Sequence, residues 1–366
     1  MNCLGLLQDR PGERTQDIHD AFVAKLIAAL RALGRPVLLV HLSIPGDAAD
    51  DHTGFSITKR AADRRIVASG LHYAILRPGF VLAPAAYGGS ALLRALAALP
   101  VGLPTREAGR PFRFVAVEDI ADTIAVLAER WKPEPPARAT VWDLMHPEAL
   151  TVGNVVGALR RWLGAEWPLR FTLPKFLLDL GARAGDLSAS LGWAPPIRSN
   201  AIAEMRRGVD GDPRPWMAAT GIAPRSLANV LMARPADVQE KWFARLYLLK
   251  AVAIASLVIF WCVSGLIALI AYPAAVAILT RHGVPDGLAQ LMTVASSLID
   301  ISVGLATAFR RTSRAALVAG IAVSLGYMAG AAILTPELWI EPLGALVKTG
   351  PAIVLMLVAL AMSDER

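Results

Sequence analysis

The sequence predicts an α/β domain with a parallel sheet, followed by an all-α bundle of four transmembrane helices. Up to about residue 150, short apolar runs alternate with helical patterns, which is typical of parallel sheets. Two later stretches, 251–280 and 315–334, contain no charged residue, and a bilayer core needs roughly 20 apolar residues per helix. Charged residues make up only 18% of the 366 positions, against about 25% in an average soluble domain. Lipid is therefore the expected solvent for part of the surface.

Residues 1–150 predict βαβ units, because the expected strands alternate with segments of helical spacing. The expected strands are 2–7, 36–42, 72–76, 112–117 and 140–144. The expected helices are 17–33, 56–69 and 120–131. Gly34 and Gly70 follow the first two helices, at a position where glycine commonly ends a helix. The Pro-rich segment 132–139 is expected to be a surface connection.

Residues 166–240 are expected to form a helical region that connects the two domains on the substrate side. Within it, the segment 174–193 has amphipathic spacing. Such a helix can pack against its own domain, cover a substrate cleft or rest on the membrane surface. The sequence leaves these alternatives open.

Residues 241–366 predict four spans, at about 247–272, 288–309, 315–334 and 343–362. The second span contains Asp300, and an aspartate near the bilayer centre costs roughly 2.5–3.5 kcal/mol. We therefore expect Asp300 to face the interior of the bundle. Its role there is either proton or quinone chemistry, or a hydrogen bond between helices to Ser264, Ser324 or Tyr327.

Three further features concern the shape and packing of the spans. Pro273 is expected to end or kink the first span. Gly326 and Gly330 form a G-x-x-x-G pair in the third span, which suits close contact between helices. Lys348 lies in the fourth span, where its long side chain can extend to the outer interface.

The basic residues beside the spans predict the orientation of the protein. Seven of them flank the expected cytoplasmic ends: Lys241, Arg245, Lys250, Arg310, Arg311, Arg314 and Arg366. Only Arg281 and Lys348 lie on the other side. By the positive-inside rule, both termini and the α/β domain are expected on the cytoplasmic side of the inner membrane. Residues 1–7 also lack the positive region that begins a signal peptide.

Charge and cysteine content argue against several classes of site. The net charge of +7 comes from basic residues that are dispersed or flank the spans, so nucleic acid is not an expected partner. Cys3 and Cys262 are far apart and predict no disulfide. His41, His52 and His72 lack the spacing of metal ligands, and no metal site is expected.

Two parts of the sequence resemble known families. The runs PVLLVHLS, GFSITKRAADRRI, LHYAILRPGFVLAP and FRFVAVEDIADTIAVL resemble the second half of an atypical short-chain dehydrogenase/reductase, related to a complex I accessory subunit and to NAD(P)-binding epimerase-like proteins. This resemblance covers residues 1–165 and implies a partial Rossmann-like sheet. The runs QEKWFARLYLLK, SLIDISVGLATAFRR and LWIEPLGALVKTGP, within residues 238–366, resemble the DoxX-like membrane domain that is found fused behind such reductases.

The reductase resemblance implies candidate catalytic residues. In the resembled enzymes a serine polarises the substrate carbonyl, and a tyrosine transfers the proton with its pKa lowered by a lysine four residues later. Ser43 and Lys59 match the serine and the lysine, but Phe55 stands at the tyrosine position and has no proton to transfer. The alternative is that Ser43 caps a turn and Lys59 is a solvated helix charge.

The resemblance also implies NAD(P) as the cofactor. The residues that match the loop near the nicotinamide are Arg77, Pro78, Gly79, Phe80 and Val81. The Gly-rich turn that holds the pyrophosphate in this family is missing from the sequence. Gly5 belongs to a segment that resembles the fourth strand of the family, so about three strands would precede it. Either Met1 is an internal start within a longer gene, or the chain is a natural remnant.

Three functional hypotheses follow from the sequence. The first is a membrane-anchored NAD(P)-dependent oxidoreductase or epimerase-like protein, or a catalytically degenerate relative, with an apolar or quinone-like substrate from the bilayer. The second is a non-enzymatic membrane or assembly factor. The third is a quinone-linked redox subunit that acts through the DoxX-like bundle. In each case the lipid bilayer is a partner, and an oligomer or a membrane complex is compatible with the sequence.

Overall fold

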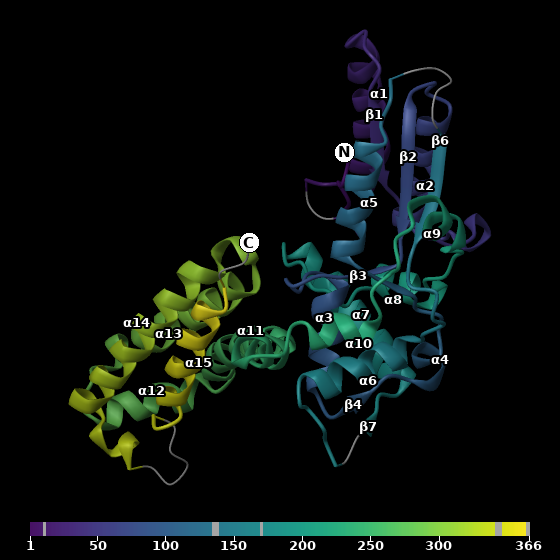
Figure 1. Ribbon diagram of the computed structural model, residues 1–366. Coiled ribbons are helices and arrows are strands. Elements are labelled where there is room, and N and C mark those ends of the chain that lie inside the picture. The colour runs from purple at the N-terminus through teal and green to yellow at the C-terminus, as the bar shows by residue number, and fades with distance from the viewer. Residues whose placement is uncertain (10–11, 134–138, 169–170, 341–345, 364–366) are drawn as a thin grey trace. The chain divides into compact units, whose positions relative to one another are not determined.

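The computed structural model describes the chain except residues 10–11, 134–138, 169–170, 341–345 and 364–366. The described residues form two compact units. The α/β unit comprises Met1–Ser190 and Ala194–Tyr247, and the helical unit comprises Leu191–Trp193 and Leu248–Arg366. Figure 1 shows strands only in the α/β unit and helices in both units. The predicted fold class, a parallel α/β part followed by an all-α part, is confirmed.

The main sheet of the α/β unit has three parallel strands in the order β1 (Leu38–Leu42), β2 (His72–Pro78) and β6 (Ala139–Leu144). The expected strand 2–7 is reduced to a single parallel bridge between Asn2 and His41. Asn2 Oδ1 accepts a hydrogen bond from the Leu4 amide at 3.1 Å, and such asparagine turns compete with a strand ladder. Two short parallel pairs complete the strands: β3 (Phe80–Leu82) with β5 (Phe114–Ala116), and β4 (Val101–Gly102) with β7 (Phe171–Thr172).

The helices of the α/β unit agree with the sequence-based expectations where these were made. A π-helical turn (Asp17–Ala21) leads into α1 (Phe22–Ala32). The 3₁₀ turn Ala48–Asp50 precedes α2 (Gly54–Val67), which begins at a capping box formed by Thr53 and Ser56. The remaining helices are α3 (Gly89–Ala98), α4 (Thr105–Ala108), α5 (Val117–Glu129), α6 (Val152–Trp162), α7 (Lys175–Ser190), α8 (Ser199–Arg207), α9 (Arg214–Thr220) and α10 (Leu227–Met232).

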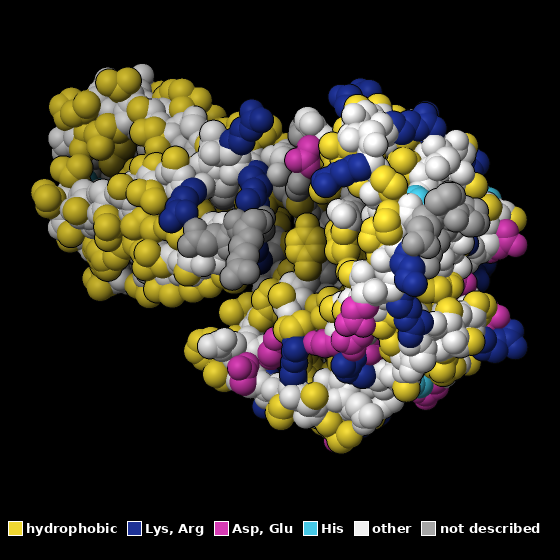
Figure 2. Space-filling model, turned by 45° about the horizontal axis from the view of Figure 1, so that its top comes forward, with side chains coloured by type: hydrophobic (Ala, Val, Ile, Leu, Met, Phe, Trp, Pro, Cys, Tyr) yellow, Lys and Arg dark blue, Asp and Glu magenta, His cyan; other side chains and the backbone are white. Residues whose placement is uncertain are grey.

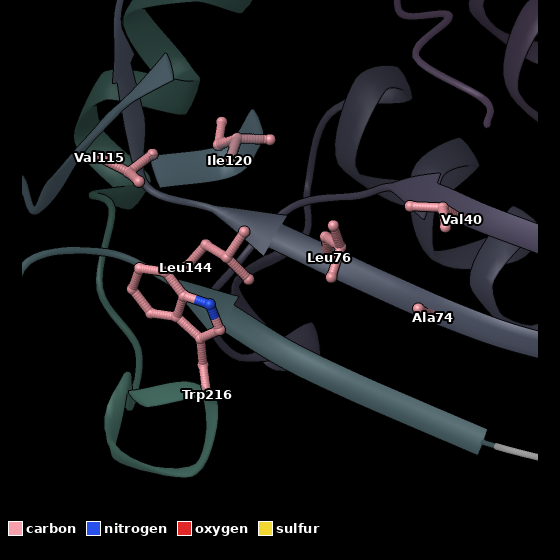
Figure 3. Packing of buried hydrophobic residues seen from close by; sticks show 7 residues of the cluster. All are labelled: Val40, Ala74, Leu76, Val115, Ile120, Leu144 and Trp216. Atoms are coloured by element: carbon pink, nitrogen blue, oxygen red, sulfur yellow. The ribbon is translucent and has the colours of Figure 1, made fainter. Parts of the chain in front are cut away.

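Both faces of the main sheet are buried, as expected for a parallel sheet covered by helices. One face packs Leu39 and Ile75 against residues of α1 and α2, namely Val23, Ile27, Ala62 and Ile66. The other face forms the cluster in Figure 3: Val40, Ala74, Leu76, Val115, Ile120, Leu144 and Trp216. Trp216 comes from α9 and donates a hydrogen bond from Nε1 to Thr123 Oγ1 at 3.0 Å. Successive residues of β2 thus point to opposite faces, with the period of a strand.

The helical unit is built from α11 (Val238–Ile270), which begins in the α/β unit, and from α12 (Tyr272–Arg281), α13 (Asp286–Ala308), α14 (Arg310–Leu334), the 3₁₀ turn Pro336–Trp339 and α15 (Thr349–Ala361). Among the described residues, three helices are long and apolar enough to cross a membrane: α11, α13 and α14. The break between α11 and α12 lies two residues before Pro273, as expected. Figure 2 shows hydrophobic side chains over much of the surface of this unit.

The expected fourth span, 343–362, overlaps α15, which has 13 residues. Pro351 lies in the first turn of this helix, where proline is tolerated because its missing N–H is not needed. Residues 343–345 lie outside the described residues. Since about 20 residues are needed to cross a bilayer, the count of four spans stays a prediction.

Glycines bring the helices of this unit close together, but at other positions than expected. A Cβ atom at Gly265 would lie 2.5 Å from the carbonyl oxygen of Ser297, and one at Gly304 would lie 2.9 Å from the backbone nitrogen of Cys262. The helices α11 and α13 therefore approach through these two glycines. A Cβ at Gly326 or Gly330 would meet no atom within 4 Å among the described residues. Among the described residues this pair mediates no close contact between helices, so that expectation is wrong for this part of the chain.

Candidate functional site

The candidate catalytic residues meet at the carboxyl edge of the main sheet. Ser43 follows the last residue of β1, and Arg77 and Pro78 are the last residues of β2. Parallel strands end at the same edge, and the Ser43 amide donates to the Leu76 carbonyl at 2.8 Å. Lys59 reaches this edge from α2, since its Nζ lies 2.9 Å from the carbonyl oxygen of Leu42. In open α/β sheets, ligands commonly bind at this edge.

Lys59 is buried and bonded to backbone rather than solvated. Its side chain is on the inner face of α2, and its Nζ donates to the carbonyl oxygens of Leu4 and Leu42, each at 2.9 Å. Burial lowers the pKa of Lys59 to about 8. The alternative expectation of a solvated helix charge is therefore wrong. The two carbonyl contacts tie α2 to the first residues of the chain and to β1.

The tyrosine position of the resembled enzymes is filled by an apolar contact. The Phe55 ring packs edge-on against the His19 ring, with 5.6 Å between the ring centroids. His19 Nε2 accepts a hydrogen bond from the Leu6 amide at 2.9 Å, and Nδ1 lies 2.8 Å from Thr58 Oγ1. Burial, helped by nearby Lys59, lowers the pKa of His19 to about 4. His19 is therefore neutral at physiological pH, and both of its ring nitrogens are occupied.

Ser43 has a buried hydroxyl that lies beside the Asp63 carboxyl group. The alternative that Ser43 caps a turn stays an expectation. Burial raises the pKa of neighbouring Asp63, although Ser43, Arg77 and Arg60 act in the opposite direction. Asp63 Oδ1 lies 3.7 Å from His41 Nε2. The pKa of His41 is lowered to about 3 by burial, with smaller effects of Lys59 and His19.

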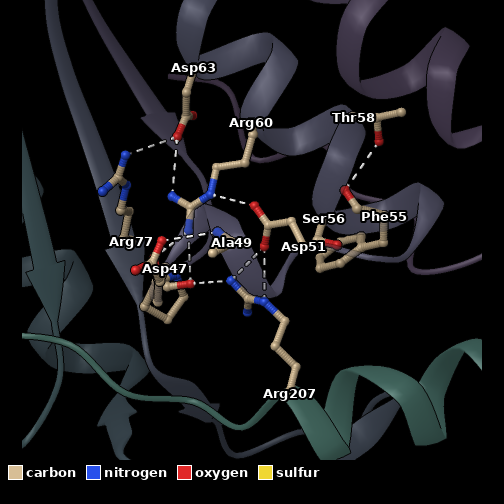
Figure 4. A network of polar contacts seen from close by, with 12 residues as sticks. Asp47, Ala49, Asp51, Phe55, Ser56, Thr58, Arg60, Asp63, Arg77 and Arg207 are labelled. Atoms are coloured by element: carbon tan, nitrogen blue, oxygen red, sulfur yellow. Dashed lines mark hydrogen bonds and ion pairs between the residues drawn. The ribbon is translucent and has the colours of Figure 1, made fainter.

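Beside these residues lies a buried network of charges, which we call the arginine network: Arg60, Arg77, Arg207, Asp51 and Asp63 (Figure 4). Arg60 Nε donates to Asp51 Oδ2 at 3.0 Å, and Arg207 Nε donates to Asp51 Oδ1 at 3.0 Å. Arg77 Nη2 lies 3.4 Å from Asp63 Oδ2. Three elements, α2, β2 and α8, thereby converge on two carboxylates.

The sequence-based reasoning missed most of this network. Arg60 and Asp63 lie beside Lys59 on α2, and all three side chains are buried. A run of charges on a helix is usually a solvated face, so its burial was not expected. A usable signal was the alternation of these charges in sign three residues apart, which permits pairing on one helix face. Arg207 lies far along the chain and gave no signal.

The segment that matches the nicotinamide loop is held by the protein's own backbone. The Gly79 amide donates to the Leu144 carbonyl, and the Phe80 amide donates to the Arg113 carbonyl, both at 2.8 Å. A Cβ at Gly79 would lie 2.7 Å from the Arg113 oxygen. Val81 continues into β3 opposite Val115. Glycine is therefore required here by the crossing of two chain segments, whether or not a cofactor binds.

The described residues do not make a complete dinucleotide site. The loop after β1 turns carbonyl oxygens, not amides, towards its charged neighbours: Pro45 and Gly46 accept from Arg60 at 3.1 and 2.5 Å, and Pro45 accepts from Arg207 at 2.6 Å. A pyrophosphate needs backbone amides at a helix N-terminus instead. Within the described part of the chain, three or more His, Cys, Asp or Glu side chains do not gather in a way that could hold a metal ion.

Asp300 is buried in the helical unit, as expected for an aspartate in a span. Tyr327 Oη, from α14, lies 2.8 Å from Asp300 Oδ1 and donates to it across the two helices. The expected contact with Tyr327 is thus confirmed. This hydrogen bond satisfies one oxygen of a carboxylate in the interior of the bundle.

A separate cavity of about 880 Å³ lies between α6 and α10. It is lined by residues such as Gly153, Arg161 and Leu231. None of the candidate catalytic or cofactor residues lines it. The carboxyl edge of the main sheet therefore remains the candidate site.

A comparison with known protein families identifies a domain in the C-terminal part of the chain. Residues 258–357 match the model of the DoxX-like family, so the C-terminal part carries a DoxX-like domain. No curated protein matches the sequence.

Solved structures similar to this chain include RMD from Pseudomonas aeruginosa complexed with NADPH, at 14% identity and a TM-score of 0.42, covering 63% of this chain and 74% of that chain. UDP-glucuronic acid 4-epimerase from Bacillus cereus, in complex with UDP-glucuronic acid and NAD, has 12% identity and a TM-score of 0.43, covering 64% and 69%. WbmF from Bordetella bronchiseptica, in complex with NAD⁺ and UDP, has 15% identity and a TM-score of 0.41, covering 65% and 67%.

Proposed function

We propose that this protein is a membrane-anchored relative of the short-chain dehydrogenases/reductases that has lost tyrosine-dependent proton transfer. The DoxX-like unit holds the α/β unit at the cytoplasmic face of the inner membrane. The α/β unit derives from an NAD(P)-dependent oxidoreductase or epimerase-like site. In its present form it is catalytically degenerate and acts as a binding surface.

The observation that carries this proposal is the environment of Phe55 and Lys59. In the resembled mechanism, a lysine lowers the pKa of a tyrosine so that the tyrosine can transfer a proton near neutral pH. Here the Lys59 ammonium is bonded to the Leu4 and Leu42 carbonyls, and the ring at position 55 faces His19. His19 is neutral and already bonded through both nitrogens. The site therefore offers a substrate carbonyl no proton donor at this position.

The loop after β1 is occupied by side chains of the protein itself. Its carbonyl oxygens at Pro45 and Gly46 bind Arg60 and Arg207. A phosphate oxygen brought to the same loop would meet acceptors and not donors. This loop therefore holds the arginine network in place.

The test uses the full-length protein in detergent micelles. NADH and NADPH are titrated while their fluorescence is followed, and their oxidation is measured with quinones and apolar carbonyl compounds. We expect no turnover above that of the detergent blank, both for the natural protein and for Phe55→Tyr. Turnover by the natural protein that is abolished in Lys59→Met, but retained in the exposed control Arg64→Met, would contradict the proposal.

A second candidate is a quinone-linked function of the helical unit. The hydrogen bond between Tyr327 and Asp300 favours it, because a tyrosine and a carboxylate buried between spans can exchange a proton with a bound quinone. The test is binding of a quinone analogue to full-length protein in lipid nanodiscs, followed by tryptophan fluorescence. Asp300→Asn and Tyr327→Phe should weaken binding markedly if this candidate is correct. If the quinone analogue binds both variants as tightly as the natural protein, this candidate is wrong and a non-enzymatic membrane or assembly role is favoured.

A further inference from the structure

The helix α7 has one face packed against the α/β unit. Its buried residues are Leu178, Ala182, Gly185 and Ala189, which recur at helical spacing. Leu178 and Ala182 pack with Ile202 of α8. A Cβ at Gly185 would clash with the Ile197 carbonyl oxygen, so the chain crosses the helix closely at this point. These contacts fix which face of α7 points inward.

The opposite face of α7 is apolar and exposed. Phe176 is 66% exposed, Leu180 59% and Leu187 68%. Positions 176, 180 and 187 lie within about one quarter of the helix circumference at 3.6 residues per turn. Phe171 in β7, just before the helix, is 69% exposed. Exposed apolar patches are a feature of surfaces that bind proteins or membranes.

The charges of α7 are compatible with a lipid surface. Its two acidic residues are already paired, since Asp179 lies 3.0 Å from Arg206 Nη2 and Asp186 lies 3.0 Å from Arg198 Nε. Arg183 is exposed on the apolar face. An arginine in that position can bury its aliphatic stem among lipid chains while its guanidinium reaches the phosphates.

The C-terminal end of α7 is tied to the membrane boundary by the chain itself. α7 ends at Ser190, and the next three residues, Leu191–Trp193, belong to the helical unit. The Leu191 carbonyl accepts a hydrogen bond from the Arg310 amide at 3.1 Å. Trp193 Nε1 donates to the Ala308 carbonyl at 2.7 Å, and its ring lies below the Arg310 guanidinium. Ala308 and Arg310 are the last residue of α13 and the first of α14, so this segment is bonded to the junction between two helices that are long and apolar enough to span a membrane.

From these observations we propose that α7 is an interfacial helix that inserts its exposed apolar face into the lipid bilayer beside the spans. Lipid is the expected partner of this face because α7 is followed directly in the chain by residues 191–193. These residues are bonded to the ends of α13 and α14, two candidate membrane-spanning helices. The inserted side chains are Phe171, Phe176, Leu180 and Leu187. Arg183 contacts lipid phosphates, and Trp193 forms the aromatic anchor at the boundary. The protein thus meets the membrane through its α/β unit as well as through its spans.

The test measures the depth of individual α7 positions in reconstituted full-length protein. Cys3 and Cys262 are the two cysteines of the chain and are replaced by serine. Single cysteines are then introduced by Phe176→Cys, Leu180→Cys and Leu187→Cys and labelled with an environment-sensitive fluorophore. The matched control is Glu129→Cys, which is exposed at the end of α5. Each variant is reconstituted into vesicles with and without lipids that carry a quencher on the acyl chain.

We expect a blue shift and strong quenching by the acyl-chain quencher at positions 176, 180 and 187, and neither effect at 129. Iodide in the buffer should quench the label at 129 and spare the other three. Quenching of all four labels by iodide would overturn the proposal, because α7 would then face water. A blue shift at 180 without lipid quenching would also overturn it, because the face would then be covered by protein, for example a second copy of the chain. Equal elution volumes of the labelled variants in size-exclusion chromatography confirm that the fold is retained.

Discussion

Two buried histidines lie in the α/β unit close to Lys59. His41 Nδ1 lies 3.0 Å from the side-chain nitrogen Nδ2 of Asn2, and His41 Nε2 faces the Asp63 carboxyl group. The pKa of His41 is about 3 and that of His19 about 4, in each case chiefly because burial disfavours the charged ring. Both residues hold the first seven residues of the chain, His41 through Asn2 and His19 through the Leu6 amide. Neutral histidine is therefore part of what keeps this segment in place.

These shifts predict acid sensitivity of the N-terminal segment. An unfolded histidine titrates near pH 6.5, so the unfolded chain binds more protons than the folded one as the pH falls below that value. The contribution of the two neutral histidines to stability is complete above pH 6.5 and is lost as the pH falls towards 4. Asp63, whose pKa burial raises, acts in the opposite sense. We expect amide exchange of residues 2–6 to accelerate between pH 6.5 and 5, after correction for intrinsic rates. His19→Gln should reduce this slope, whereas the exposed control His52→Gln should not.

At the scale of residues, the sequence placed Ser43 directly after an expected strand and Lys59 within an expected helix, and the structure has both elements, because strand ends and helix spacing are local properties. It did not reveal that Lys59 is buried on the Leu4 carbonyl, because that contact joins residues 55 positions apart. For the same reason Arg207 could not be linked to Asp51. Charge pairing between distant segments depends on tertiary structure, which spacing along the chain does not encode.

At the scale of elements, the arginine network fastens α8 to the loop before α2. Arg207 pairs with Asp51, and both side chains are at most 7% exposed. Arg207 also donates to the Pro45 carbonyl at 2.6 Å. Breaking a buried pair leaves an uncompensated charge, whereas an exposed pair adds little.

Arg207→Met should therefore lower the free energy of unfolding by about 3 kcal/mol. This value lies at the lower end of the range observed for breaking buried ion pairs, because Arg60 still contacts Asp51 in the variant. Arg214→Met, which removes an exposed arginine paired with Asp212, is the matched control and should leave stability nearly unchanged. Chemical denaturation of the full-length protein in micelles measures both. Equal effects of the two substitutions would argue against a structural role of the network.

Gly79 lies between β2 and β3, where the chain passes close to the backbone of Arg113. In Gly79→Ala the new Cβ would lie 2.7 Å from the Arg113 carbonyl oxygen, and relieving such a clash costs about 1–3 kcal/mol. In Gly181→Ala, within α7, no atom lies within 4 Å among the described residues, and the helix should gain about 0.5–1 kcal/mol. Melting temperatures should thus move in opposite directions. An unchanged melting temperature in Gly79→Ala would argue against the close approach of the two segments.

At the scale of the whole molecule, the two-part architecture could be predicted because long apolar runs and βαβ alternation are properties of contiguous sequence. The number of spans was harder to predict, since hydropathy does not show where a helix begins. Pro351 in the first turn of α15 leaves a helix of 13 residues. The glycines that bring the spans together, Gly265 and Gly304, also lacked a sequence signature, because each is opposed by a residue of a different helix.

We propose that a membrane-embedded DoxX-like unit holds the α/β unit on the cytoplasmic side of the membrane. The most direct test is labelling of the two native cysteines with a membrane-impermeant maleimide. Cys3 is exposed in the α/β unit, and Cys262 lies within α11. We expect Cys3 to react in inverted inner-membrane vesicles but not in intact cells, and Cys262 to react in neither, with Cys3→Ser abolishing the signal. Labelling of Cys3 from outside intact cells would instead place the α/β unit on the outer side of the membrane.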